Sequence, residues 1–171
     1  MITENPMTVR ERRAVASLAL LYCFRMLGLF MVLPLLALYA SDLGGASPAM
    51  IGLALGIYGL TQALLQIPFG WLSDLVGRKP VIIGGLLLFA LGSIIAAMAD
   101  TMSGIILGRT LQGSGAIAST VMALVADLTR EEQRTKAMAL VGISIGLSFA
   151  VAMVLGPIVA AMGGLAAVFW F

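Results

Sequence analysis

The stretch FGWLSDLVGRKPVI, residues 69–82, places an acid and two bases in the middle of an apolar sequence. Asp74 and Arg78 are four residues apart, and the intervening Gly77 allows a tight turn. The chemistry that this spacing offers is an ion pair that can form and break, rather than a covalent reaction. The alternative is that Arg78 and Lys79 only provide the positive charge that is common in cytoplasmic loops of membrane proteins.

Two further charges, Arg25 and Arg109, lie well inside long apolar runs. An arginine at the centre of a bilayer costs at least about 2.5–3.5 kcal/mol, so it faces a bundle interior or a water-filled cavity. The partners available are backbone carbonyls, water, Gln112, or groups outside this chain. The two arginines either line a substrate or ion pathway or tether helices to one another.

Uncharged polar residues recur at helical spacing in the same apolar runs. Gln62 and Gln66 are four residues apart and share one helix face, as do Ser144 and Ser148. These side chains either line a polar cavity or form hydrogen bonds between helices. The sequence does not favour one alternative over the other.

The composition indicates that the elements carrying these residues are transmembrane helices. Hydrophobic residues make up 61% of the 171 residues, charged residues only 11%, and the mean hydropathy is +1.08. This composition predicts an integral membrane protein, and the net charge of +2 gives no indication of nucleic-acid binding. A single cysteine, Cys23, and no histidine exclude an intramolecular disulfide and a Cys/His metal site.

Five apolar segments are long enough to span a bilayer as helices, and a sixth begins near the end of the chain. We therefore predict an all-α fold with a 1–13 N-terminal tail and a transmembrane unit over 14–171. The expected spans are 14–40, 48–72, 80–99, 102–126, 136–162 and the start of a sixth at 165–171. Because a seven-residue stub cannot cross a bilayer, we expect a fragment or a truncated chain.

The basic residues predict the orientation. Arginines and lysines occur in the N-terminal tail and in the loops after the second and fourth expected spans, but not in the loops after the first and third. The positive-inside rule therefore places the N-terminus in the cytoplasm. In the second basic loop, Thr129 and Glu132 fit a capping box that would start the next helix.

An internal repeat is visible between the second and fifth expected spans. IGLALGIYG at 51–59 matches VGISIGLSF at 141–149, and a proline follows in each span. Opposite directions through the membrane would make this a 3+3 inverted repeat, as in secondary transporters. The alternative is chance recurrence of small residues that pack membrane helices closely. The glycines concerned are Gly52, Gly56, Gly142 and Gly146.

Gly156 and Pro157 place a helix breaker inside the fifth expected span. Proline removes a backbone hydrogen bond and kinks a helix. The kink either serves packing or takes part in gating.

Two motifs resemble signatures of the major facilitator superfamily. GWLSDLVGRKPVI at 70–82 matches its loop signature, and RTLQGSGA at 109–116 matches its second signature. Gly156-Pro157 resembles the core of a third, antiporter-associated signature, although Ala152 and Ala160-Ala161 replace glycines of that pattern. The resemblance covers the whole chain, and the chain is similar to the N-terminal six-helix half of bacterial proton-driven drug efflux proteins.

The resemblance implies a secondary transporter, not an enzyme, in a bacterial inner membrane. It implies proton-coupled export of small amphipathic or drug-like molecules by alternating access, with a proton gradient and no cofactor. The alternatives are a transporter of sugars or organic metabolites, or a truncated membrane protein that transports nothing. The implied partners are the lipid bilayer, a small-molecule substrate and a missing C-terminal six-helix half, but no nucleic acid.

The resemblance also implies residue roles. A conformational latch on the cytoplasmic side would consist of Gly70, Asp74, Gly77, Arg78, Lys79 and Asp127. Arg109 would lie near a central cavity and take part in proton coupling, for which the other candidates are Arg25, Gln112, Gln62 and Gln66. Arginine does not titrate in the useful range, so the proton carrier is Asp74, Asp127 or an acid in the missing half.

Overall fold

The computed structural model describes residues 6–171, which form helices with short connections. The elements are α1 (Val9–Tyr39), the short 3₁₀ helix η1 (Ala40–Asp42), α2 (Pro48–Val76), α3 (Arg78–Ala97), α4 (Met102–Ser114), α5 (Ala118–Asp127) and α6 (Glu131–Trp170). Of the predicted N-terminal tail 1–13, residues 1–5 lie outside the described residues, and α1 begins within the remainder.

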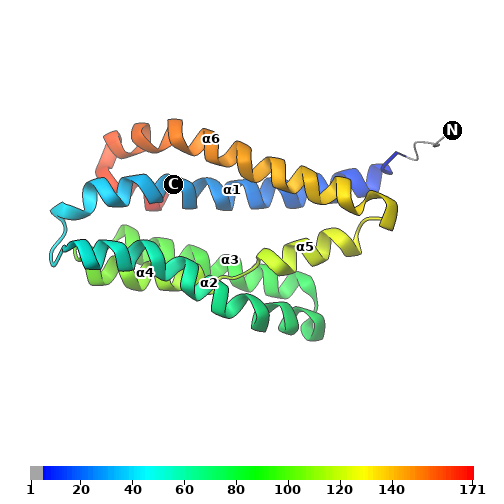
Figure 1. The fold of residues 1–171 in the computed structure, drawn as a ribbon, viewed down its shortest axis with the longest axis horizontal. Coiled ribbons are helices and arrows are strands. Elements are labelled where there is room, and N and C mark those ends of the chain that lie inside the picture. The colour runs from blue at the N-terminus through cyan, green and yellow to red at the C-terminus, as the bar shows by residue number, and fades with distance from the viewer. Residues whose placement is uncertain (1–5) are drawn as a thin grey trace.

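The helices form two layers. Figure 1 shows α1 and α6 side by side in one layer, with α2, α3 and α4 packed together in the other. α1 packs mainly along α6 and makes few contacts with α2, although α2 follows it in sequence. The α1–α6 layer is therefore built from helices that are distant in the chain, whereas α2, α3 and α4 are consecutive. α5 lies between the two layers at one end.

Local signals account for the helix starts. The Thr8 hydroxyl accepts a hydrogen bond from the Glu11 backbone, and the Glu11 carboxylate accepts one from the Thr8 backbone, so a capping box begins α1. The capping box predicted at Thr129 is wrong. The residue preceding α6 is Arg130, and the Thr129 hydroxyl instead donates to the Val125 carbonyl, 2.7 Å away.

The prediction of five uninterrupted spans is wrong. In the part of the chain that the structure describes, four helices are long and apolar enough to cross a membrane: α1, α2, α3 and α6. The expected span at 102–126 is divided into α4 and α5 by the non-helical residues 115–117. The fold is all-helical with several apolar helices, and the 3+3 inverted repeat stays a prediction.

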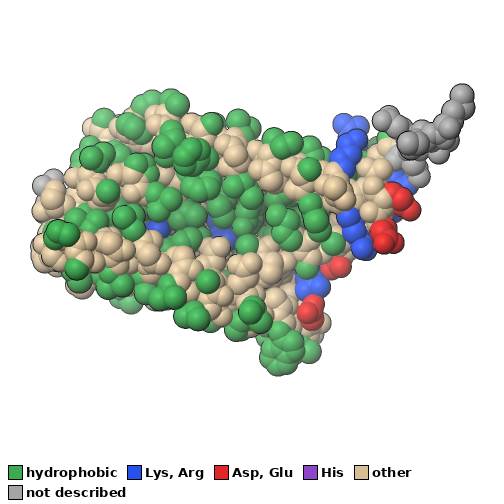
Figure 2. Space-filling view, in the orientation of Figure 1, with side chains coloured by type: hydrophobic (Ala, Val, Ile, Leu, Met, Phe, Trp, Pro, Cys, Tyr) green, Lys and Arg blue, Asp and Glu red, His purple; other side chains and the backbone are tan. Residues whose placement is uncertain are grey.

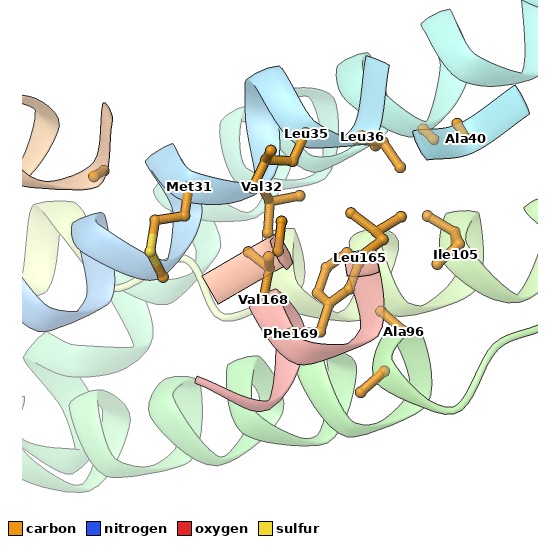
Figure 3. Close-up of a cluster of buried hydrophobic side chains, with 14 of the residues drawn as sticks. Met31, Val32, Leu35, Leu36, Ala40, Ala96, Ile105, Leu165, Val168 and Phe169 are labelled. Carbon is orange, nitrogen blue, oxygen red and sulfur yellow. The ribbon is translucent and has the colours of Figure 1, made fainter. Parts of the chain in front are cut away.

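α6 includes the expected fifth span and then changes direction. Gly163 and Gly164 leave the helical conformation, and Gly164 has a φ of 64°, which favours glycine. The turn brings the last residues back against α1 and the α3–α4 pair (Figure 3). The buried side chains there include Val32, Leu35, Leu36, Ala96, Ile105, Leu165, Val168 and Phe169.

Candidate functional site

Charged side chains are concentrated at one end of the molecule. Figure 2 shows acidic and basic side chains gathered at the end where α1 begins, next to a surface that is largely hydrophobic. Two small patches of basic side chains are also visible away from this end, within the apolar surface.

Arg78 is held by two carboxylates from different helices. Gly77, with a φ of 97°, makes the turn between α2 and α3, so Arg78 becomes the first residue of α3. Its guanidinium pairs with Asp74 near the end of α2, and its Nε lies 3.2 Å from the Asp127 carboxylate at the end of α5. The Ser73 hydroxyl accepts a further hydrogen bond from Arg78, at 2.6 Å.

This cluster is partly exposed to solvent. The side chains of Asp74 and Asp127 are 59% and 55% exposed, whereas that of Arg78 is 23% exposed. Water and salt screen such pairs, so the contacts contribute little stability and can be broken without a large penalty. The arrangement is suited to a contact that opens and closes.

The two other predicted latch residues lie beside this cluster. Lys79 is exposed and, among residues 6–171, forms no ion pair. Gly70 faces α5, where an added Cβ would lie 3.4 Å from the Ser119 hydroxyl. The Ser119 hydroxyl itself donates to the Gln66 carbonyl at 3.1 Å, which joins α5 to α2 beside the cluster.

A second ionic contact at this end was missed from the sequence. The Glu11 carboxylate accepts hydrogen bonds from the Arg130 backbone N–H at 2.9 Å and from its Nε at 3.0 Å. The pKa of Arg130 is raised, chiefly because its guanidinium donates a hydrogen bond to the Glu11 carboxylate. The capping pattern around Glu11 was a usable local signal, but no pattern pointed to a partner 119 residues away.

Arg109 is completely buried between α4 and α2. Its Nε donates to the Ala54 carbonyl at 3.3 Å, and its guanidinium lies 4.7 Å from the centre of the Tyr58 ring. Its Nη1 donates to the Gln112 side chain at 3.1 Å, and Gln112 in turn donates to Ser93 of α3 at 2.7 Å. No carboxylate of the described part of the chain pairs with it.

Arg25 of α1 is also buried, with 4% of its surface exposed. Its Nη2 donates to the Gly115 carbonyl at 2.6 Å and lies 3.5 Å from the Tyr58 hydroxyl. The guanidinium also lies 5.3 Å from the centre of the Phe89 ring. Tyr58 therefore contacts both buried arginines, which the sequence had placed in separate spans.

The remaining polar candidates are not joined to this pair of arginines. Gln62 Oε1 is buried and, within the described residues, has no hydrogen-bond partner. The Gln66 backbone carbonyl accepts a hydrogen bond from Ser119 of α5. Ser148 of α6 is buried and donates to the Cys23 carbonyl of α1 at 3.0 Å. Ser148 thus takes the interhelical alternative left open by the sequence.

The glycine of the predicted helix kink and the four glycines of the predicted repeat have different surroundings. Gly156 is buried where α6 crosses α1, with the Met31 backbone 3.6 Å from an added Cβ, and Pro157 follows it on an exposed face. For each of the four repeat glycines, in contrast, an added Cβ would have no atom of residues 6–171 within 4 Å. Their role in helix packing stays a prediction. They are Gly52, Gly56, Gly142 and Gly146.

The sequence was compared with known families and proteins. A family model described as Major Facilitator Superfamily matches residues 18–171. The inner membrane transport protein YajR of Escherichia coli K12 is 63% identical over 169 residues, which are 99% of this chain and 37% of that protein. An uncharacterized transporter of Buchnera aphidicola subsp. Schizaphis graminum is 46% identical, with 94% of this chain and 41% of that protein covered.

The multidrug resistance protein MdtH of Aeromonas hydrophila is 38% identical over 116 residues, which are 67% of this chain and 29% of that protein. The chain thus spans 37–41% of the length of the first two relatives. These matches indicate a transporter rather than an enzyme.

Proposed function

This chain belongs to the Major Facilitator Superfamily, and from that premise we propose that it forms the N-terminal half of a proton-coupled exporter. The exporter would move small amphipathic or drug-like molecules across the inner membrane by alternating access. One relative is named a multidrug resistance protein, which supports this substrate class. A C-terminal half with six further helices would complete the transport path.

The observation that carries the proposal is the position of Arg78 between Asp74 and Asp127. Its partners belong to α2 and α5, and Arg78 itself begins α3, so the contact joins three helices at one end of the molecule. Partly exposed ion pairs of this kind are weak enough to break during a conformational change. We propose that they hold the cytoplasmic side closed and separate as the transporter opens inward.

The charged end is proposed to face the cytoplasm. Arg10, Arg12 and Arg13 lie near the start of α1, and the Arg78 and Arg130 contacts lie at the same end. The positive-inside rule favours the cytoplasmic side for such an end. The N-terminus would then be cytoplasmic.

Proton coupling requires a group that titrates. The buried Arg109 keeps its charge near neutral pH, so it is proposed to act on a proton site electrostatically rather than as the carrier. Asp74 and Asp127 are partly exposed carboxylates at the charged end of the molecule. The proton carrier is therefore proposed to be one of these two, or an acid of the C-terminal half.

The test is transport by the full-length protein in proteoliposomes with an imposed proton gradient. We expect gradient-dependent movement of amphipathic drug-like cations, strongly reduced by Asp74→Asn at unchanged protein yield. Asp100→Asn is the matched control, because Asp100 is an exposed acid in the α3–α4 connection, outside the latch.

Three results would contradict the proposal. Wild-type turnover in Asp74→Asn would remove the latch role. Transport of a sugar or organic acid in place of drug-like cations would replace the substrate class. A protein that moves none of these compounds would favour a membrane protein without transport activity.

A further inference from the structure

The break between α4 and α5 is a tight turn rather than a gentle bend. α4 ends at Ser114, the Gly115 N–H donates to the Gln112 carbonyl at 3.2 Å, and the Ile117 N–H donates to the Gly115 carbonyl at 2.9 Å. Regular helical hydrogen bonds resume only in α5. The chain between the two helices is buried, with Ala116 and Ile117 both 0% exposed.

Arg25 binds this turn from α1. Its Nη2 donates to the Gly115 carbonyl at 2.6 Å, the shortest of its contacts, and this carbonyl lies just past the C-terminus of α4. A cation is favoured there, because the last carbonyls of a helix carry partial negative charge. α4 has no basic residue in its last turn, so Arg25 supplies this positive charge from α1.

α3 fixes the opposite side of the turn. An added Cβ on Gly115 would overlap the Gly85 carbonyl, and an added Cβ on Gly85 would overlap the Ile117 side chain. Both overlaps involve rigid or fully buried atoms, so the close approach of the turn to α3 requires glycine at both positions. The break is therefore held between Gly85 of α3 and Arg25 of α1.

α5 connects this turn to the charged end. Its ten residues run from Ala118 to Asp127, which corresponds to about 15 Å of helix at a rise of about 1.5 Å per residue. Over this helix length, a tilt of about 10° at the turn would move Asp127 by about 2.6 Å. That displacement is comparable with the 3.2 Å separation of Asp127 from Arg78 Nε.

We propose that Arg25 is a positioning residue that sets the direction of α5, and with it the contact between Asp127 and Arg78. The consequence of this contact for transport rests on the proposed function, whereas the effect of Arg25 on the direction of α5 does not. The role differs from a substrate or ion pathway, because Arg25 acts through the Gly115 carbonyl. Its charge serves to hold a broken helix at a fixed angle.

The test measures distances between spin labels in the full-length protein, without substrate or proton gradient, in a background in which Cys23 and any cysteine of the remaining chain are replaced by serine. One pair of labels, at Leu64 of α2 and Leu128 at the end of α5, spans the break. A control pair, at Leu64 and Leu91 of α3, does not. All three label positions are exposed. Arg25→Met removes the donors at similar volume, and Arg25→Lys keeps a cationic donor.

We expect Arg25→Met to at least double the width of the Leu64–Leu128 distance distribution and to leave the Leu64–Leu91 distribution as in the parent. In Arg25→Lys the width of the Leu64–Leu128 distribution should be closer to that of the parent than in Arg25→Met. An unchanged Leu64–Leu128 distribution in Arg25→Met would overturn the proposal, as would equal broadening of both pairs or a lysine variant as broad as the methionine variant. A protein that transports nothing would contradict the proposed function but leave these distances to decide the role of Arg25.

Discussion

Gly108→Ala is expected to separate α4 from α3, because the two helices meet through their backbones. An added Cβ on Gly108 would lie 2.6 Å from the Gly92 carbonyl oxygen and 2.8 Å from the Ala96 backbone nitrogen. The approach is reciprocal, since an added Cβ on Gly92 would lie 2.5 Å from the Gly108 carbonyl oxygen. Backbone atoms cannot rotate away, so one helix must shift.

The size of the effect follows from comparing two alanine substitutions. Gly84 is on the exposed side of α3, and an added Cβ there meets no atom within 4 Å. Both substitutions gain helix propensity of roughly 1 kcal/mol, so this gain cancels when they are compared. The overpacking at Gly108 remains and costs about 1–3 kcal/mol, which is roughly a 5- to 150-fold change in the unfolding equilibrium.

The assay is reversible unfolding of the full-length protein in mixed detergent micelles, followed by circular dichroism. The Gly108→Ala protein should unfold at a lower denaturant fraction than the Gly84→Ala protein, and the two should be expressed equally well. If the Gly108→Ala and Gly84→Ala proteins are equally stable, the close backbone contact between α3 and α4 does not exist as described.

The remaining predictions concern the two ionic contacts at the charged end. Asp127→Asn leaves Arg78 paired with one carboxylate, so transport should fall less than in the Asp74→Asn/Asp127→Asn double variant. Equal initial transport rates in the single and double variants would show that the two ion pairs of Arg78 do not contribute separately. Glu11→Gln removes the charge that binds Arg130, so hydrogen–deuterium exchange should accelerate at the start of α6 but not in α4, and unchanged exchange at α6 would show that the pair is not needed to order that helix end.

The sequence alone was informative where the signal is local or compositional. Apolar runs of sufficient length predicted α1, α2 and α3, and the turn at Gly77 follows from a glycine where φ is 97°. The structure brings Asp74, Arg78 and Asp127 together, and their role in transport stays a prediction. Asp127 became a candidate only through the family resemblance, because nothing near Asp127 in sequence indicates Arg78.

The features that the sequence did not predict depend on distant partners. The run at 102–126 is apolar and contains no proline, so its composition predicted one span. At the observed break the turn contacts Gly85 and Arg25, which belong to other helices. The pairing of Glu11 with Arg130 was likewise not predictable from the sequence, because the two residues are 119 positions apart.

The pairing of α1 with α6 has a consequence for the order of assembly. α1 is synthesised well before its main partner α6, which begins only at Glu131. Contacts between such distant segments form late, because the intervening chain must be ordered first. During synthesis, α1 must therefore remain in the bilayer with its packing face, including Val32 and Leu35, covered by lipid or by the insertion machinery.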